Sequence, residues 1–284
     1  MSLGLERVLL ALQSIAPLEL AEEWDNAGLL LEPVKPRKIR KISLTIDLTE
    51  PVLAEALAGR ADLVVAYHPP WFHPLRRLSR SVPHERVLLR AIRAGLSIYS
   101  PHTALDAAPG GVNDWLADGL GAGLRRSLVR PPRTTETAAL AIDAEREAPV
   151  AGQGRELILA RPVSLNTLLN RIKRHLSLSR LRVARAERHR SGHPSPALIE
   201  RIALCAGAGA EVLAGSDAEL LLTGEMRHHD VLARVAASQS VVLSEHSHTE
   251  RGYLPVLERR LRDELGPEVK VAISARDADP LVTA

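Results

Sequence analysis

Aromatic residues are scarce in this chain of 284 residues, and it also lacks the features that mark several special classes of protein. Phe, Trp and Tyr make up 2% of the residues, which leaves few rings for the base stacking that single-strand nucleic-acid binders use. The 37 basic and 34 acidic residues nearly balance, so the net charge of +3 permits nucleic-acid binding without implying it. No stretch approaches the roughly 18 to 20 uninterrupted apolar residues of a membrane span.

A single cysteine, Cys205, excludes an internal disulfide framework. This fits a reducing compartment, and the residue itself is expected to be a small buried apolar group in a strand. The N-terminal segment has Leu5, Val8, Leu9 and Leu12 at helical spacing and shows no cleavage-site pattern. We therefore expect a folded first helix, a cytoplasmic location and no membrane association.

The chain does have enough apolar residues for a sizeable core, 45% of the total, in short runs that alternate with amphipathic segments. This alternation is typical of an α/β fold with a largely parallel sheet, with helices between the strands. The predicted strands are 41–47, 62–66, 96–100, 138–142, 156–160, 181–184, 202–206, 219–223, 241–244 and 269–273.

Two stretches interrupt this pattern. The segment RRSLVRPPRTTE ends the first group of elements near Leu124, so we expect a first α/β lobe over 1–124 and a second over 125–284. The segment ERHRSGHPSPALIE has the turn residues of an exposed loop, so His189 is expected to be solvated, as is His175 in its basic context. Neither stretch is long enough to be a flexible tether between independent domains.

Histidine and carboxylate residues follow three of the predicted strands. His68 stands in YHPP, His102 and Asp106 in PHTALD, and His246 and Glu250 in EHSHTE. Ligands of open α/β sheets bind at the carboxyl ends of the strands, and the i,i+4 spacing of the two pairs directs both side chains to one side of a helical turn. Imidazole and carboxylate donors suit zinc, iron, manganese or cobalt. These five residues are therefore the predicted metal ligands.

Spacing alone is a weak filter, because eleven histidines produce some chance neighbours and a lone histidine near a strand end is more often structural. Three clusters at equivalent positions favour the metal site. The sequence GAGAE from Gly207 also follows a strand, but it lacks the full dinucleotide fingerprint and a P-loop lysine. We interpret it as a tight strand-to-helix turn.

Seven motifs together carry a family resemblance. They resemble the NIF-three-like (NIF3-like) family, NGG-one-interacting factor three, whose members are also known as GTP cyclohydrolase I type 2 homologues. The resemblance covers nearly the whole chain apart from about 125–197. In chain order the motifs are EEWDNAGLL, DLTEPVLAEAL, VVAYHPPWFHPLRRL, IYSPHTALDAAPGGVNDWLADGLGA, LCAGAGAEVL, LLTGEMRHHDVL and EHSHTERGYLPVLERRL.

The resemblance implies a two-lobed α/β fold with mixed sheets flanked by helices, two divalent metal ions in the cleft between the lobes, and a toroidal homohexamer. By motif, the first lobe would supply His68, His102 and Asp106 as ligands, and the second lobe His246 and Glu250. Which ligand bridges the two ions is left open.

Two positions depart from the family pattern. Tyr67 stands where many bacterial members have the first histidine of an HHP motif, so one expected ligand is missing; YHPP resembles the branch that includes eukaryotic members. His248 stands where the family usually has asparagine. It could partly replace the missing imidazole, but its i,i+2 spacing points it away from His246, so we interpret it as a spectator.

The predicted function is that of a metal-dependent hydrolase, GTP cyclohydrolase-like or a phosphoesterase, acting on a nucleotide or related small molecule. Glu225 and His229, after the predicted strand 219–223, would shuttle protons, and Asp47 would orient ligands or contact substrate. The alternative is a non-catalytic, metal-stabilised scaffold or regulatory interaction protein. Five ligands for two ions leave open coordination positions, which favours the enzyme. Nucleic-acid binding within a ring is a third, weaker interpretation.

Overall fold

The chain folds into two compact units. The computed structural model describes residues 2–130, 151–190, 192–193 and 197–281, so the predicted strand over 138–142 lies outside the described residues. Unit 1 comprises Met1–Leu105 and Tyr253–Ala284, and unit 2 comprises Asp106–Gly252. This division differs from a single boundary near Leu124, because the last strand of the chain pairs with a strand near its beginning and so returns to the first sheet.

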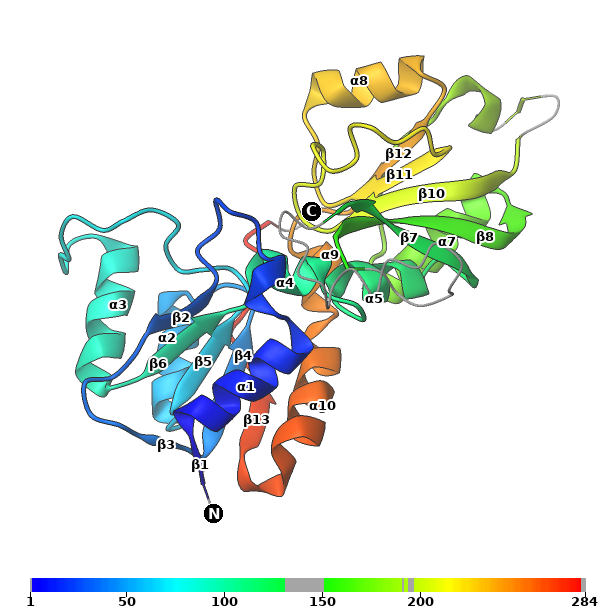
Figure 1. Cartoon of the computed structure of the whole chain (residues 1–284). Coiled ribbons are helices and arrows are strands. Elements are labelled where there is room, and N and C mark those ends of the chain that lie inside the picture. The colour runs from blue at the N-terminus through cyan, green and yellow to red at the C-terminus, as the bar shows by residue number, and fades with distance from the viewer. Residues whose placement is uncertain (1, 131–150, 191, 194–196, 282–284) are drawn as a thin grey trace. The chain divides into compact units, whose positions relative to one another are not determined.

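Unit 1 is built on a five-stranded sheet in the order β13-β4-β5-β6-β2. The first four of these strands are parallel, and β2 is an antiparallel edge. Figure 1 shows α10 and β13, in orange and red, beside the blue β4. The strands are β1 (Leu3–Gly4), β2 (Gly28–Leu31), β3 (Lys38–Ile39), β4 (Lys41–Thr45), β5 (Leu63–Ala66), β6 (Ser97–Ser100) and β13 (Lys270–Ile273).

Helices cover both faces of this sheet, which is why its central strands read as continuous apolar runs. One face packs against α2 and α3 through a shared cluster of buried aliphatic residues. The helix α10 packs against β13, β4 and α1. The helices of unit 1 are α1 (Leu5–Ile15), η1 (Leu18–Leu20), α2 (Glu50–Ala58), α3 (Pro83–Ala94), α10 (Leu254–Leu265) and η3 (Gly266–Glu268).

Unit 2 has a six-stranded mixed sheet in the order β7-β8-β10-β11-β12-β9, with a parallel centre of β10, β11 and β12. One face packs on α5 and α7, and residues near α8 pack on the other. The strands are β7 (Gly123–Val129), β8 (Gln153–Val163), β9 (Arg182–Ala184), β10 (Ile199–Cys205), β11 (Leu220–Thr223) and β12 (Ser240–Leu243). The helices are α5 (Val112–Asp118), α7 (Leu165–Leu176), η2 (Glu187–His189), α8 (His228–Ala236) and α9 (His248–Arg251). None of the described helices is long and apolar enough to cross a membrane.

Three local predictions are wrong. The beginning of the arginine-rich stretch, residues 125–129, belongs to β7, which pairs with β8 and is an edge strand among the strands that the structure describes. His189 is buried in η2, where its Nδ1 lies 2.9 Å from Ser240 Oγ. The ring centroids of His175 and Trp115 lie 4.5 Å apart, and burial lowers the pKa of this imidazole.

Ser164 provides a simple test of local stability in unit 2. Its hydroxyl caps α7 by accepting from Thr167 N at 3.2 Å, which satisfies one of the free amides of the first turn. Ser164→Ala is expected to lower the free energy of unfolding by about 1 kcal/mol in urea denaturation. The exposed Ser179→Ala serves as the control, with an expected change within about 0.5 kcal/mol. Equal effects of the two substitutions would contradict the capping role.

Candidate metal centre

The predicted site residues of unit 1 lie at the carboxyl ends of its parallel strands. Asp47 follows β4, His68 follows β5 and His102 follows β6. Because parallel neighbours end at the same edge of a sheet, these side chains meet there. The ring centroids of His68 and His102 lie 5.5 Å apart. This edge of the sheet thus brings His68 and His102 together.

A carboxylate holds each of these imidazoles. His68 Nδ1 lies 2.9 Å from Asp47 Oδ1, and His102 Nδ1 lies 2.8 Å from Asp25 Oδ1. An ionised carboxylate only accepts hydrogen bonds, so Nδ1 carries a proton, and in the neutral ring Nε2 then has the free lone pair that a metal ion needs. Histidines that bind metals are commonly held in this way, because the partner fixes both the tautomer and the direction of the ring.

Asp25 is a functional candidate that the sequence analysis did not single out. Its buried carboxylate also accepts from Thr103 N at 3.1 Å and from Thr103 Oγ1 at 2.5 Å. Burial alone would raise the pKa of Asp25, but the hydrogen bonds from His102 and Thr103 outweigh burial and lower the pKa. Asp25 belongs to the motif EEWDN, yet 77 residues separate it from His102, so no local spacing connects the two.

Backbone strain occurs in two of the three histidine motifs. His102 has φ 27° and Glu245, directly before His246, has φ 66°. The other described non-glycine residues with positive φ, Arg60, Ser177 and Ser238, follow the ends of helices, where this conformation is common. Left-handed backbone at a non-glycine residue costs about 1–3 kcal/mol and is concentrated at functional sites. The two strained residues therefore support a functional role for these motifs.

In unit 2, the third histidine follows the same pattern at the carboxyl ends of β11 and β12. His246 Nδ1 lies 2.7 Å from Glu225 Oε1, and Glu225 follows β11 by two residues. On its other side, His246 Nε2 lies 3.3 Å from Oε1 of the buried Glu250. The ring is therefore held by one carboxylate and directed at another.

The separation of His246 and Glu250 fits a shared metal ion. Two ligand atoms about 2.1 Å from an ion at a tetrahedral angle are about 3.4 Å apart, close to the observed 3.3 Å between Nε2 and Oε1. Gly207 faces both donors: it has φ +61°, and a Cβ there would lie 2.7 Å from Glu250 Oε1 and 3.1 Å from His246 Nε2. A side chain at position 207 would therefore displace these donors. The GAGAE segment forms turns as predicted, but no helix follows it directly.

Asp106 and Glu250 both act on the buried Cys205 of unit 2. Burial raises the pKa of Cys205, and the negative charges of Asp106 and Glu250 raise it further. Cys205 itself is buried in β10, as predicted. Asp106 and His102 lie one turn apart on α4 (His102–Ala107), as the i,i+4 spacing predicts.

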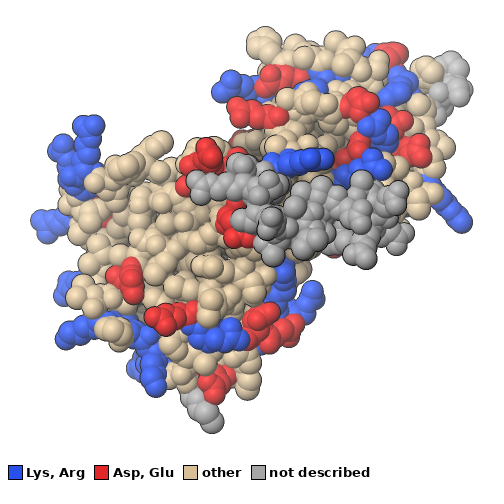
Figure 2. Space-filling view, in the orientation of Figure 1, with Lys and Arg blue, Asp and Glu red and all other residues tan. Residues whose placement is uncertain are grey.

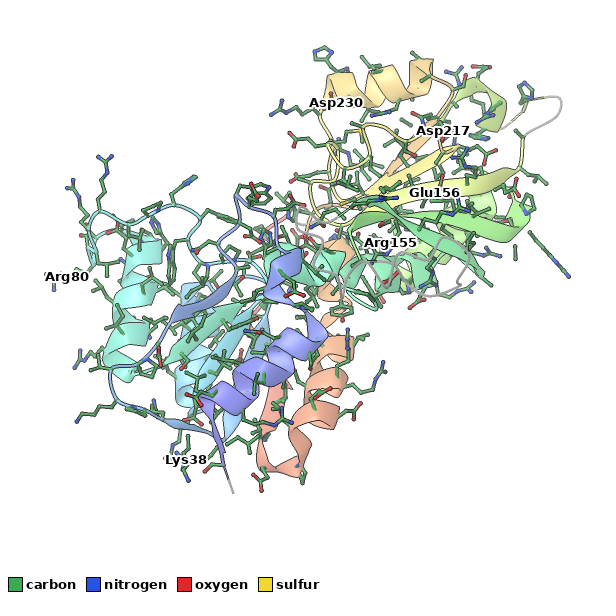
Figure 3. The ribbon with its side chains drawn as sticks, viewed as in Figure 1. Lys38, Arg80, Arg155, Glu156, Asp217 and Asp230 are labelled. Carbon is green, nitrogen blue, oxygen red and sulfur yellow. The ribbon has the colours of Figure 1, made fainter. Side chains whose placement is uncertain are left out.

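A network of buried polar groups holds the segment that follows Asp106. Asn113 donates to Asp106 O at 3.1 Å and accepts from Ala206 N at 2.9 Å, which ties α5 to the end of β10. Beside it, the fully buried Arg155 pairs with Asp114 through two hydrogen bonds of 2.8 and 3.0 Å. Arg155 is labelled in Figure 3, at the start of β8. These contacts fix the backbone that carries Asp106.

The remaining predicted residues differ in their surroundings. Glu225 holds His246, whereas His229 lies exposed on α8 with its ring 5.5 Å from that of His228. Their proton-transfer roles stay predictions. Tyr67 is buried with its ring 5.0 Å from that of His68. His248 Nδ1 lies 3.1 Å from Ser244 O, and its role as a spectator stays a prediction.

Comparison with known proteins gives consistent matches over the whole chain. A family model described as Duf34/NIF3 (NGG1p interacting factor 3) matches residues 3–280. The NIF3-like protein 1 of Bos taurus is 36% identical over 351 residues, covering 98% of this chain and 92% of the relative. The NGG1-interacting factor 3 of Saccharomyces cerevisiae is 33% identical over 291 residues, covering 99% and 97%. A solved structure, a Bacillus cereus protein related to NIF3, matches the fold with a TM-score of 0.80 at 18% identity and complete coverage of both chains.

Proposed function

The chain belongs to the Duf34/NIF3 (NGG1p interacting factor 3) family, and from that premise we propose that it is a metal-dependent hydrolase of a nucleotide or related small molecule. The proposed ligands are His68, His102, Asp106, His246 and Glu250. The observation that carries the proposal is that all three histidines have Nδ1 held by a carboxylate, which leaves Nε2 as a metal donor.

We propose that these residues form one site at the junction of the two units. Connectivity supports this: the chain crosses between the units directly after Leu105 and directly after Gly252. The first crossing separates His102 from Asp106 within α4, and the second follows Glu250 by two residues. Both predicted ligand pairs are therefore next to the places where the chain passes from one unit to the other.

We propose that the site holds two divalent cations. Five protein donors shared between two cations would leave coordination positions open. When bound, such cations supply Lewis-acid activation of water and of the electrophilic centre of the substrate. Asp25, Asp47 and Glu225 keep the three imidazoles in the tautomer and direction that this requires. Glu225 and His229 are proposed to transfer protons.

The hydrolase proposal is tested with protein that contains stoichiometric metal. Opening of the imidazole ring of GTP and release of phosphate from phosphoesters are measured separately, with metal-free protein as the blank. Metal-dependent turnover in either assay is the expected result. Metal-loaded protein that does neither would contradict hydrolysis and favour the scaffold alternative.

Asp25 offers a test of the metal site that is independent of turnover. Asp25→Asn removes the charge that holds His102, and loss of such an orienting partner typically lowers metal affinity 10- to 100-fold. Calorimetric titration with Zn²⁺ measures this change, and circular dichroism confirms that the variant is folded. The exposed Asp263→Asn is the matched control and should bind like the wild type. Equal affinities of the two variants would contradict the role of Asp25.

A second candidate function is a metal-stabilised scaffold in protein interaction, because the relative from Saccharomyces cerevisiae is named as an interacting factor. We also propose assembly as a toroidal homohexamer, which sedimentation would test. Nucleic-acid binding has less support: basic and acidic side chains are interspersed on the face drawn in Figure 2. In a scaffold, metal removal would lower stability and partner binding without affecting any turnover.

A further inference from the structure

More than half of the aromatic residues of this chain lie in one region of unit 1. The sequence has only three tryptophans, three tyrosines and one phenylalanine. Four of these seven, Trp24, Tyr67, Trp71 and Phe72, lie in two loops of unit 1 that meet at the carboxyl edge of its sheet. In a chain with so few rings, this grouping beside His102 requires an explanation.

Two of these rings are exposed although large apolar side chains gain free energy from burial. Trp24 is 64% exposed and Phe72 is 44% exposed, whereas Tyr67 in the same group is 3% exposed. Trp24 and Phe72 each contact His102 edge to face, with ring centroids 6.0 and 5.6 Å from that of the imidazole. The exposed rings therefore lie directly beside a proposed metal ligand.

The two loops that carry these rings are tied together. Asn26 Nδ2 donates to Trp71 O at 2.8 Å, so the loop after Trp24 and the loop before Phe72 are joined by a hydrogen bond. Asp25, between Trp24 and Asn26, is fixed by His102 and Thr103. The backbone on each side of the exposed rings is thus held in place, which lowers the entropy cost of binding a ligand against them.

We infer that Trp24 and Phe72 bind a planar nitrogen heterocycle of the substrate and hold it beside the metal ligands. This inference rests on the proposed metal-dependent function and identifies the substrate class and the residues that select it. Aromatic side chains stack on planar heterocycles whatever their substituents, because every such ring presents a π-face. The two residues are specificity determinants and take no part in the chemical step.

The test compares probes that differ only in the ring. Nucleoside 5′-monophosphates carry a heterocycle, and ribose 5-phosphate has the same sugar and phosphate without it. Calorimetric titration of metal-loaded protein is expected to show at least about tenfold tighter binding of a nucleoside monophosphate, from the usual contribution of one stacked base. If no nucleoside monophosphate binds more tightly than ribose 5-phosphate, the inference is wrong.

Substitutions of Trp24 and Phe72 then test whether these residues form the binding site for the heterocycle, here called the ring site. Trp24→Leu and Phe72→Leu should each lower nucleotide affinity about tenfold or more and leave ribose 5-phosphate binding unchanged, while Trp24→Phe and Phe72→Tyr should retain most of the affinity. Leu10→Ala, at another exposed apolar residue of unit 1, is the control. A leucine variant that keeps full nucleotide affinity contradicts binding of the heterocycle by that residue. If such a variant changes only the sedimentation mass, the exposed rings form an interface between copies of the chain instead.

Metal titration of the same samples separates the two proposals. Failure of the wild-type chain to bind metal contradicts the proposed function. The affinities for the nucleoside monophosphate and for ribose 5-phosphate are then compared with the metal-free chain. Normal metal binding together with equal affinity for both probes contradicts the ring site alone.

Discussion

Replacing His246 with alanine is expected to abolish stoichiometric metal binding. The imidazole lies between Glu225 and Glu250, with Nδ1 2.7 Å from Glu225 and Nε2 3.3 Å from Glu250. Loss of an outer partner of a metal-binding histidine usually costs 10- to 100-fold in affinity, so loss of the ligand itself should exceed about a hundredfold. Calorimetric titration and elemental analysis of dialysed protein measure the effect.

His248→Ala is the matched control, since it removes an imidazole two residues away in the same motif. Its i,i+2 spacing points His248 away from His246, so its removal should leave metal affinity within a few-fold of the wild type. Full metal retention by His246→Ala would overturn the ligand assignment. Loss of metal in His248→Ala would instead make His248 the replacement for the imidazole that Tyr67 displaces.

Glu250→Gln extends the same reasoning without changing the size of the side chain. The carboxylate is buried, and an amide oxygen is a weaker donor to a divalent cation than a charged oxygen. This substitution should therefore weaken metal binding in the same titration while the fold is kept.

The positions of the imidazoles could be predicted from the sequence because they depend on strand ends. A short buried strand followed two or three residues later by a histidine places that side chain at the carboxyl edge, and β5, β6 and β12 are all fully buried strands of this kind. Of their carboxylate partners, Asp47 and Glu225 were singled out because they also follow strands, but Asp25 was not, and none of the three pairings could be assigned. Asp25 reaches His102 across 77 residues and Glu225 reaches His246 across 21, contacts that depend on the folded topology.

The fold shows the same division between local and long-range information. The central strands were predicted well because they are short, buried and apolar. The pairing of β13 with β4 was not predicted, because it joins strands more than 220 residues apart in the sequence. The edge strand β7 was not predicted either, because its sequence is arginine-rich and largely exposed. His189 was misplaced for a similar reason: its burial depends on Ser240, 51 residues away.

Replacing Arg155 with methionine is expected to lower the free energy of unfolding by about 3–5 kcal/mol, the usual cost of removing one partner from a buried ion pair. The guanidinium is fully buried, pairs with both oxygens of Asp114 and donates to the carbonyl oxygens of Gly152, Gly154 and Ala108. Methionine fills much of the space but leaves a buried carboxylate and three carbonyl groups without these donors. Urea denaturation measures the change against a total of about 5–15 kcal/mol for a typical domain.

Arg201→Met provides the control for this substitution. Arg201 also pairs with two carboxylates, Glu156 and Asp217, but its side chain is 38% exposed, so water screens the pairs and the expected cost is at most about 1 kcal/mol. The double variant Arg155→Met/Asp114→Leu should be more stable than Arg155→Met, because the unpaired buried charge is then absent. If Arg155→Met were as mild as Arg201→Met, Arg155 would not be the residue that fixes the backbone after Asp106. In that case the tie between Asn113 and Ala206 would have to hold this segment by itself.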